Sequence, residues 1–384
     1  MGFKCGIVGL PNVGKSTLFN ALVAQAAAEA ANYPFCTIEP NIGRVGVPDD
    51  RLDVAAKIAG SAQIIPTQIE FVDIAGLVRG ASKGEGLGNQ FLAHIREVDA
   101  ICMVLRCFED GDITHVEGRI DPLADAEIIE TELVLADLES VEKRLPNLQK
   151  KAKGGDKEAK IQAALCEKLA ALLNDGKPAR ELKVTDAEED KQFKMLQLLT
   201  AKPMMVVCNV EEASAASGNA LSAKVQAALK VPCVVVSAKI ESEVAVLEPE
   251  EKQAFLADLG LKETGLSRVI HTGYSLLGLI TFLTIGPKEA RAWTVHKGAT
   301  APEAAGVIHT DFQKGFIRAE TIAYADYVKH QGEQGAKEAG RMRLEGKEYL
   351  VQDGDVLLKF TGPQLRHVAE LLMRVVRAVC CVEI

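Results

Sequence analysis

The 384-residue chain has 48% hydrophobic and 25% charged residues, a composition typical of folded globular proteins that excludes a disordered chain. Its net charge of −9 at pH 7 excludes a protein that coats nucleic acid over its whole surface, so nucleic-acid contact would need a local basic patch. No uncharged apolar stretch is long enough to cross a membrane, and the length allows two or three domains.

The nine cysteines are scattered, and several lie in apolar runs without a Cys-x-x-Cys or zinc-ligand spacing. This pattern predicts buried, reduced thiols in a cytoplasmic protein. Met1 leads almost directly into the first apolar run, which leaves no room for a signal peptide.

The first motif lies almost at the N-terminus, where residues 9–17 have the spacing G-x-x-x-x-G-K-[ST]. An apolar run precedes it and apolar residues at helical spacing follow it, which is the context of a phosphate-binding loop. Backbone N–H groups of such a loop cradle phosphates, its lysine reaches the outer phosphates, and its serine hydroxyl binds Mg²⁺. The predicted nucleotide contacts are Asn12, Val13, Gly14, Lys15, Ser16 and Thr17, with Lys15 also catalytic and Ser16 also a metal ligand.

Two later segments are typical of the metal site of a phosphate-loop NTPase. Residues 32–41 contain prolines and no regular period, which predicts a loop that supplies Thr37 as a further Mg²⁺ ligand. The alternating run 68–73 predicts a strand that ends at Asp73, which we expect to support Mg²⁺ through water. Gly76, three residues later, can contact the terminal phosphate.

Leu77 stands where many GTPases carry the glutamine that orients the attacking water. An apolar side chain cannot orient water, so hydrolysis is slow or another group positions the water. The glycine-rich residues that follow predict a second switch segment. For positioning the water we consider His115, in the polar loop after the predicted strand 100–106, with His94 as its rival, although a lone histidine is more often structural.

A helical hairpin is predicted from about residue 123, because apolar residues recur at spacings of four and three from Val134 to Leu148 and again from Ile161 to Leu172. Pro146 should kink or break the first helix. The polar tip is basic, and we interpret it either as an RNA contact or as a merely solvated turn. Its lysines are Lys150, Lys151, Lys153, Lys157 and Lys160.

The predicted strand 204–209 leads into the segment at which GTPases carry N-K-x-D. The aspartate of that motif accepts hydrogen bonds from two guanine N–H groups. Here Val210 replaces the lysine and the longer Glu212 replaces the aspartate, which weakens discrimination against ATP. The predicted base contacts are Asn209, Val210, Glu212 and, after the predicted strand 232–236, Ser237.

Beyond a helical segment at 266–279, short strand-like runs separated by glycine-rich turns predict a small β-rich domain. The last residues have apolar positions at helical spacing and predict an amphipathic helix that docks on protein and not on a membrane. The predicted division is a nucleotide domain at 1–122 and 200–279, a helical insertion at 123–199, a β-rich domain at 280–362 and a helical tail at 363–384.

These motifs in this order resemble the Obg-like ATPase (YchF) family of TRAFAC-class phosphate-loop NTPases. The resemblance extends to about Phe360 and also rests on the strings at residues 34–41, 84–91, 291–294, 308–312 and 315–319. It implies an α/β nucleotide domain of the Obg type with an inserted helical arm and a C-terminal TGS domain of β-grasp fold.

The resemblance further implies a Mg²⁺-dependent ATPase that prefers ATP over GTP, hydrolyses it slowly and associates with ribosomes through RNA or protein. Asn12 resembles the asparagine that helps to bind an activating K⁺ in related NTPases. Two alternatives stay open: a GTPase of the Obg type, and a ribosome- or RNA-binding adaptor in which hydrolysis is incidental. The tail from Thr361 inherits no function from the resemblance.

Overall fold

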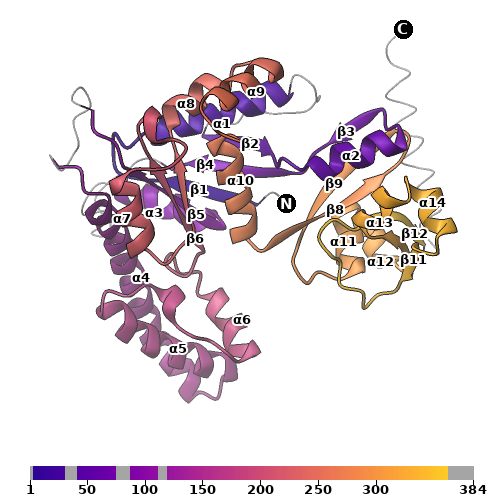
Figure 1. Cartoon of the computed structure of the whole chain (residues 1–384). Helices are drawn as coiled ribbons and strands as arrows, with labels where there is room; N and C mark the ends of the chain where they lie inside the picture. Colours follow the sequence, from indigo (N-terminus) through magenta and orange to yellow (C-terminus); the bar gives the residue numbers. More distant parts are fainter. Residues whose placement is uncertain (1–2, 31–40, 75–86, 111–118, 362–384) are drawn as a thin grey trace, which may run out of the picture. The chain divides into compact units, whose positions relative to one another are not determined.

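The computed structural model of the chain describes residues 3–30, 41–74, 87–110 and 119–361 (Figure 1). The backbone divides into two compact units, of which unit 1 contains residues 1–45 and 69–277 and unit 2 contains residues 46–68 and 278–384. Some of the predicted features lie outside the described residues: Thr37, Gly76, Leu77, His115 and the tail 363–384.

Unit 1 is built on a six-stranded sheet in the order β2-β4-β1-β5-β6-β7, in which the five strands from β4 to β7 are parallel. Every residue of β5 and β6 is buried, because helices cover both faces of a sheet of this kind. The predicted strands at 68–73, 100–106 and 204–209 are confirmed residue by residue. The strands are β1 (Lys4–Val8), β2 (Ile42–Gly46), β4 (Gln68–Asp73), β5 (Ala100–Arg106), β6 (Met204–Asn209) and β7 (Cys233–Val236).

The helices of unit 1 follow the strands in alternation, as expected for a parallel sheet. A short 3₁₀ turn, η3 (Glu212–Ser214), follows β6 directly. The described helices of this unit are α1 (Lys15–Ala30), α3 (Leu87–Glu97), α4 (Pro122–Lys153), α5 (Lys157–Asn174), η2 (Ala179–Glu181), α6 (Ala187–Met195), α7 (Ala220–Ala228), α8 (Ala238–Val244), α9 (Pro249–Asp258) and α10 (Gly265–Leu276).

Helices α4 and α5 form a hairpin that projects from the sheet region of unit 1 (Figure 1). Its seam contains the apolar residues that the spacing singled out, with Val134, Val141, Leu165 and Leu169 buried in one cluster. Pro146 lies inside α4, which continues to Lys153, so of the two expected effects the proline does not break the helix. The helix continues because packing of its apolar side against α5 offsets the lost backbone hydrogen bond.

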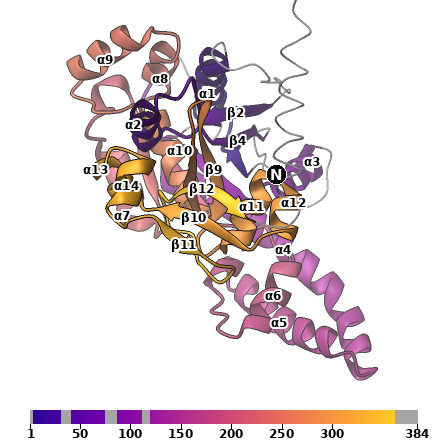
Figure 2. The ribbon, with the colours of Figure 1, turned by 90° about the vertical axis from the view of Figure 1, so that its right-hand side faces the viewer.

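Unit 2 has a second, mixed sheet of six strands in the order β11-β10-β12-β8-β9-β3, with helices on both faces (Figure 2). One face packs on α2, α13 and α14 through Leu52, Tyr327 and Ala336, and the other packs on α11 and α12 through Ala304 and Phe312. The strands are β3 (Gln63–Ile65), β8 (Leu279–Ile285), β9 (Glu289–His296), β10 (Arg318–Ile322), β11 (Arg343–Glu345) and β12 (Val356–Thr361). The helices are α2 (Asp50–Ala59), α11 (Ala301–Ile308), α12 (Thr310–Lys314), α13 (Tyr324–Lys329) and α14 (Glu333–Glu338).

The sequence analysis placed residues 46–68 in the nucleotide domain, whereas the structure clusters them with unit 2. The reason is that β3 pairs in parallel with β9 and α2 buries Leu52, Ala55 and Ala56 on the second sheet. One of the short strand-like runs of the predicted β-rich domain is residues 349–352, and it makes only an isolated bridge, between Leu350 and Thr300. Within the described ranges, no helix is long and apolar enough to cross a membrane.

Candidate functional site

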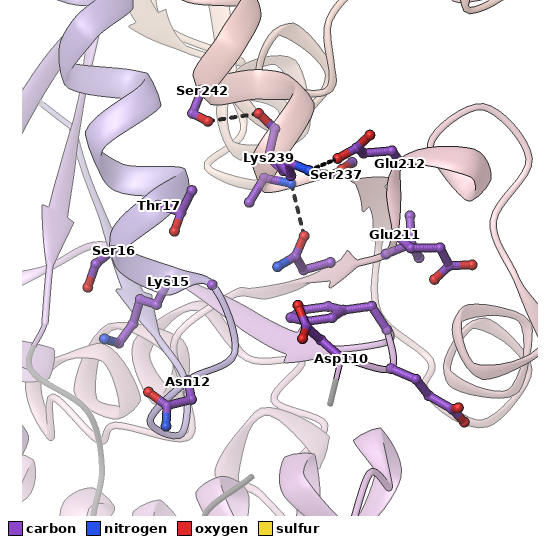
Figure 3. A pocket seen from close by; sticks show the side chains of 16 residues that line it. Asn12, Lys15, Ser16, Thr17, Asp110, Glu211, Glu212, Ser237, Lys239 and Ser242 are labelled. Carbon is purple, nitrogen blue, oxygen red and sulfur yellow. Dashed lines mark hydrogen bonds and ion pairs between the residues drawn. The ribbon is translucent and has the colours of Figure 1, made fainter. Parts of the chain in front are cut away.

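A cavity of about 590 Å³ lies in unit 1, at the ends of the parallel strands where their loops meet the first turn of α1. Asn12, Lys15, Ser16 and Thr17 approach it from the α1 side, and Ser237, Lys239 and Glu212 approach it from the opposite side (Figure 3). The carboxyl edge of a parallel sheet is where such folds bind ligands. This cavity therefore brings together most of the described residues that the motifs singled out.

The loop between β1 and α1 has the backbone conformation that a phosphate cradle needs. Asn12 and Gly14 have positive φ angles of 63° and 91°, and the Leu18 N–H donates to the Gly14 carbonyl at 3.0 Å. A Cβ atom on Gly14 would lie 2.1 Å from Nδ2 of Asn209, so only glycine fits there. The N-terminus of α1 follows, and the first N–H groups of any helix have no partner within it and form the positive end of its dipole.

Lys15 and Asp73 form an ion pair beside the loop, with 3.8 Å between Nζ and Oδ1. Only 11% of the lysine side chain and 19% of the aspartate side chain are exposed. Burial raises the pKa of Asp73, and the charge of Lys15 opposes that rise. The pair places an ammonium group and a partly desolvated carboxylate side by side next to the loop, where they could contact phosphate and metal.

Asp73 Oδ1 is buried and, among the described residues, accepts no hydrogen bond. Ser16, in the first turn of α1, is exposed to solvent and its side chain lines the cavity. A hydroxyl and a carboxylate with spare acceptor capacity fit Mg²⁺, which keeps several waters and takes few protein ligands. Over the same residues, no group of three or more His, Cys, Asp or Glu side chains offers a site for a metal held by protein alone.

Asn209, at the end of β6, joins two loops. Its Nδ2 donates to the Val13 carbonyl at 3.0 Å, and its Oδ1 accepts from the Ala238 N–H at 2.9 Å. The side chain is buried, so both hydrogen bonds are shielded from water. The amide therefore ties the phosphate loop to the loop after β7, a positioning role that the motif alone did not indicate.

The remaining predicted base contacts lie on the far side of the cavity. Val210 is buried and its N–H donates to the Val236 carbonyl, while the Ser237 hydroxyl is buried and has no hydrogen-bond partner among the described residues. Glu212 forms an ion pair with Lys239, and this hydrogen bond raises the pKa of Lys239 (Figure 3). An unpartnered hydroxyl in a cavity wall is a ready contact for a polar ligand atom.

Sequence reasoning missed the segment Phe108, Glu109 and Asp110, which also lines the cavity. Arg106 stabilises the conformation of this segment. The residue is only 1% exposed, and its guanidinium donates hydrogen bonds to the carbonyls of Phe108 and Asp110. The guanidinium carbon also lies 4.6 Å from the centre of the Phe108 ring. The available signal was an arginine that ends a wholly apolar strand, because a charge buried there needs local partners.

His94, the rival for positioning water, lies on α3 with an exposed side chain and does not line the cavity. Lys239 and Ser242 do line it, although the sequence analysis did not select them. Both lie on α8, so this helix as well as its N-cap residue Ser237 contributes side chains to the cavity.

Two family profiles match the chain: "50S ribosome-binding GTPase" over residues 4–136, and the C-terminal region of the YchF GTPase, described as a protein of unknown function, over residues 279–361. The chain is 60% identical over 359 residues to the "Ribosome-binding ATPase YchF" of Haemophilus influenzae, covering 93% of this chain and 98% of the relative. It is 56% identical over 362 residues to the protein of the same name from Bacillus subtilis, with the same coverage.

Among solved structures, the Schizosaccharomyces pombe YchF GTPase matches with a TM-score of 0.85 and 37% identity, covering 94% of this chain and 98% of that one. These matches span both units of the chain. The first profile covers the segment that contains the phosphate loop, and the second covers the C-terminal part of unit 2. The chain belongs to the YchF family.

Proposed function

We propose that this chain is a cytoplasmic, Mg²⁺-dependent ATPase that binds the ribosome and uses its nucleotide state as a switch. Its close relatives in the family are named ribosome-binding ATPases. The observation that supports the proposal best is the partly buried Lys15–Asp73 pair beside a cavity into which the phosphate loop opens.

In this proposal the backbone N–H groups of the loop and Lys15 hold the phosphates, and Gly76 contacts the terminal phosphate. Ser16, Thr37 and, through water, Asp73 would hold Mg²⁺, which neutralises charge on the phosphates when bound. Asn12, whose side chain reaches the cavity rim, would contribute to a K⁺ site. His115 is our proposed water-positioning residue.

ATP is the proposed nucleotide because the carboxylate at position 212 is not free. Guanine offers two N–H donors to a bare carboxylate, whereas the Glu212 carboxylate is paired with Lys239. The Ser237 hydroxyl and the Phe108 ring supply polar and stacking contacts that a purine can use without that carboxylate.

The experiment that tests the proposal measures dissociation constants for ATP and GTP side by side, and ATP turnover with and without 70S ribosomes in K⁺ and in Na⁺ buffers. We expect tighter binding of ATP, slow basal turnover and faster turnover in K⁺. A clear preference for GTP would support the Obg-type GTPase instead. Ribosome affinity that is equal in the ATP and ADP states would support the adaptor alternative.

Replacing Lys239 with alanine should shift base selectivity toward guanine. The change frees Glu212 to accept hydrogen bonds from the guanine N–H groups. The GTP dissociation constant should therefore fall by about threefold to tenfold, while the ATP dissociation constant changes little. The expected shift is modest because the side chains of Lys239 and Glu212 are largely exposed. Lys230→Ala, which removes an exposed lysine outside the cavity, is the matched control. An unchanged ratio of the two constants would show that Lys239 does not set selectivity.

The α4–α5 hairpin is the proposed arm, unit 2 contains the proposed TGS domain, and both are proposed ribosome contacts. The five tip lysines are exposed, and within the described part of the chain none of them makes an ion pair. Three of them also lie in the last turn of α4, where they interact favourably with the helix dipole. Only these three of the five lysines can interact with the helix dipole in this way. The additional positive charge at the tip therefore favours a ligand with many phosphates.

Reversing two tip charges, Lys151→Glu with Lys153→Glu, should weaken binding to 70S ribosomes about tenfold in low salt and reduce the slope of log affinity against log salt by about 1.5. The matched control reverses two exposed lysines elsewhere in unit 1, Lys224→Glu with Lys230→Glu. Filter binding at several salt concentrations measures both quantities. If tip and control variants bind alike, the tip is only a solvated turn.

A further inference from the structure

A second hollow lies in unit 1, away from the nucleotide cavity. Strand β7 forms its floor, α10 forms one wall, and α7 with the segment before it forms the other. Its volume is about 410 Å³, and it shares no lining residue with the nucleotide cavity. We call this hollow the β7 groove, defined by Cys233, Val235, Glu263, Arg268 and His271 together with Ala216, Ser217, Gln226, Val234 and Thr272.

The floor of the β7 groove is an open sheet edge. β7 is the last strand of the sheet, and it pairs with β6 through the carbonyls of Pro232 and Val236, which accept from Val206 and Val210 at 2.8 Å each. Backbone groups of successive residues in a strand point to opposite edges. The N–H and C=O groups of Cys233 and Val235 therefore face away from β6, and within the described residues none of these four groups has a hydrogen-bond partner.

The walls of the groove carry polar side chains, of which Arg268 also lies near the buried Glu241 and opposes the rise that burial causes in the pKa of that carboxyl. Arg268 and His271 lie three residues apart on α10 and so share the helix face toward the groove. Across the described part of the chain, neither of them makes a hydrogen bond or an ion pair through its side chain. Burial raises the pKa of the Cys233 thiol to about 11, so the floor is uncharged near neutral pH.

We propose that the β7 groove binds an extended peptide segment of a partner protein, which adds as a strand to β7 and places an acidic side chain against Arg268. The four unpaired backbone groups of Cys233 and Val235 supply the strand pairing, as in other complexes in which a peptide extends a sheet. A guanidinium in a sheltered groove pairs well with a carboxylate.

The shape of the site favours a peptide over a second copy of this chain. Residues of α10 and of the segment with α7 line the hollow beside β7, so a second copy would have to bring its own helical walls against these to pair edge to edge. An isolated extended segment is narrow enough to enter. Glu263, which precedes α10, also lines the groove, and the guanidinium of Arg268 on α10 supplies the positive charge of the lining.

The test uses the full chain and a fluorescent, terminally blocked hexapeptide of alternating valine and threonine with one central glutamate. Two counterparts carry lysine in place of the glutamate, or N-methyl groups on one backbone edge. Fluorescence anisotropy should show at least tenfold tighter binding of the glutamate peptide than of either counterpart. Equal affinities for the three peptides, or no binding of the glutamate peptide, would overturn the proposal.

Arg268→Glu should reverse the order of affinity, so that the lysine peptide binds more tightly than the glutamate peptide. Val235→Pro removes one outward N–H at an edge where proline is tolerated, and it should weaken the binding of both peptides. Arg119→Glu, an exposed arginine outside the groove, is the matched control and should change neither. ATP affinity and thermal unfolding of each variant separate lost docking from lost folding. If the glutamate peptide still binds Arg268→Glu more tightly than the lysine peptide does, the assignment to a partner peptide is wrong. It is also wrong if the parent protein forms a dimer in sedimentation without peptide and Arg268→Glu abolishes that dimer.

Discussion

Replacing Lys15 with alanine is expected to weaken ATP binding by at least 100-fold, about 2.7 kcal/mol, and to abolish measurable turnover. Its ammonium lies beside the phosphate loop, 11% exposed, where a charge-assisted hydrogen bond to phosphate is stronger than in water. The substitution also leaves Asp73 without its cation, and burial already raises the pKa of that carboxyl. Loss of Lys15 therefore weakens both the phosphate contact and the proposed metal support.

Isothermal titration with ATP in the presence of Mg²⁺ measures the effect, and a ribosome-stimulated turnover assay measures the catalytic part. The matched control is Lys168→Ala on α5, which removes an exposed lysine whose ion pair with Glu189 spans 3.5 Å. An exposed pair of this kind contributes little to stability. ATP affinity within threefold of the parent protein in Lys15→Ala would contradict the assignment of the loop as the phosphate site.

Replacing Asn209 with alanine is expected to lower the free energy of unfolding by about 3 kcal/mol and to reduce ATP affinity strongly. The buried amide is the link between the Val13 carbonyl and the Ala238 N–H, so its loss leaves two buried backbone groups without partners. The phosphate loop and the loop after β7 then lose their common support. One substitution should therefore disturb both halves of the cavity.

Urea unfolding and ATP titration of the same variant separate the two effects. Asn209→Asp should fall between parent and alanine variant, because it keeps an acceptor for the Ala238 N–H but loses the donor to Val13. Asn174→Ala removes an exposed asparagine that bonds only the Ala170 carbonyl, and it should cost much less. Parent-like unfolding and ATP affinity in Asn209→Ala would show that the bridge is dispensable.

Much of unit 1 was predictable because its signals are local. The limits of β4, β5 and β6 follow from contiguous apolar or alternating runs, and the phosphate loop follows from a glycine and lysine spacing within nine residues. Unit 2 was less predictable. Its short helices α11 to α14 have few turns each, so their apolar positions hardly form a period, and only their packing on the sheet shows them.

By itself, the sequence indicated the family, which the comparisons confirm, and it predicted the phosphate loop and Glu212 in place of the guanine-reading aspartate, because each of these signals lies in neighbouring residues. Only the tertiary structure shows that residues 46–68 join the second sheet and that Asn209 connects two loops by hydrogen bonds. It also shows that Lys239 forms an ion pair with the Glu212 carboxylate. It also left the outer edge of β7 open beside Arg268. These contacts join residues far apart in the chain, and neither propensity nor spacing specifies which distant partner a side chain meets.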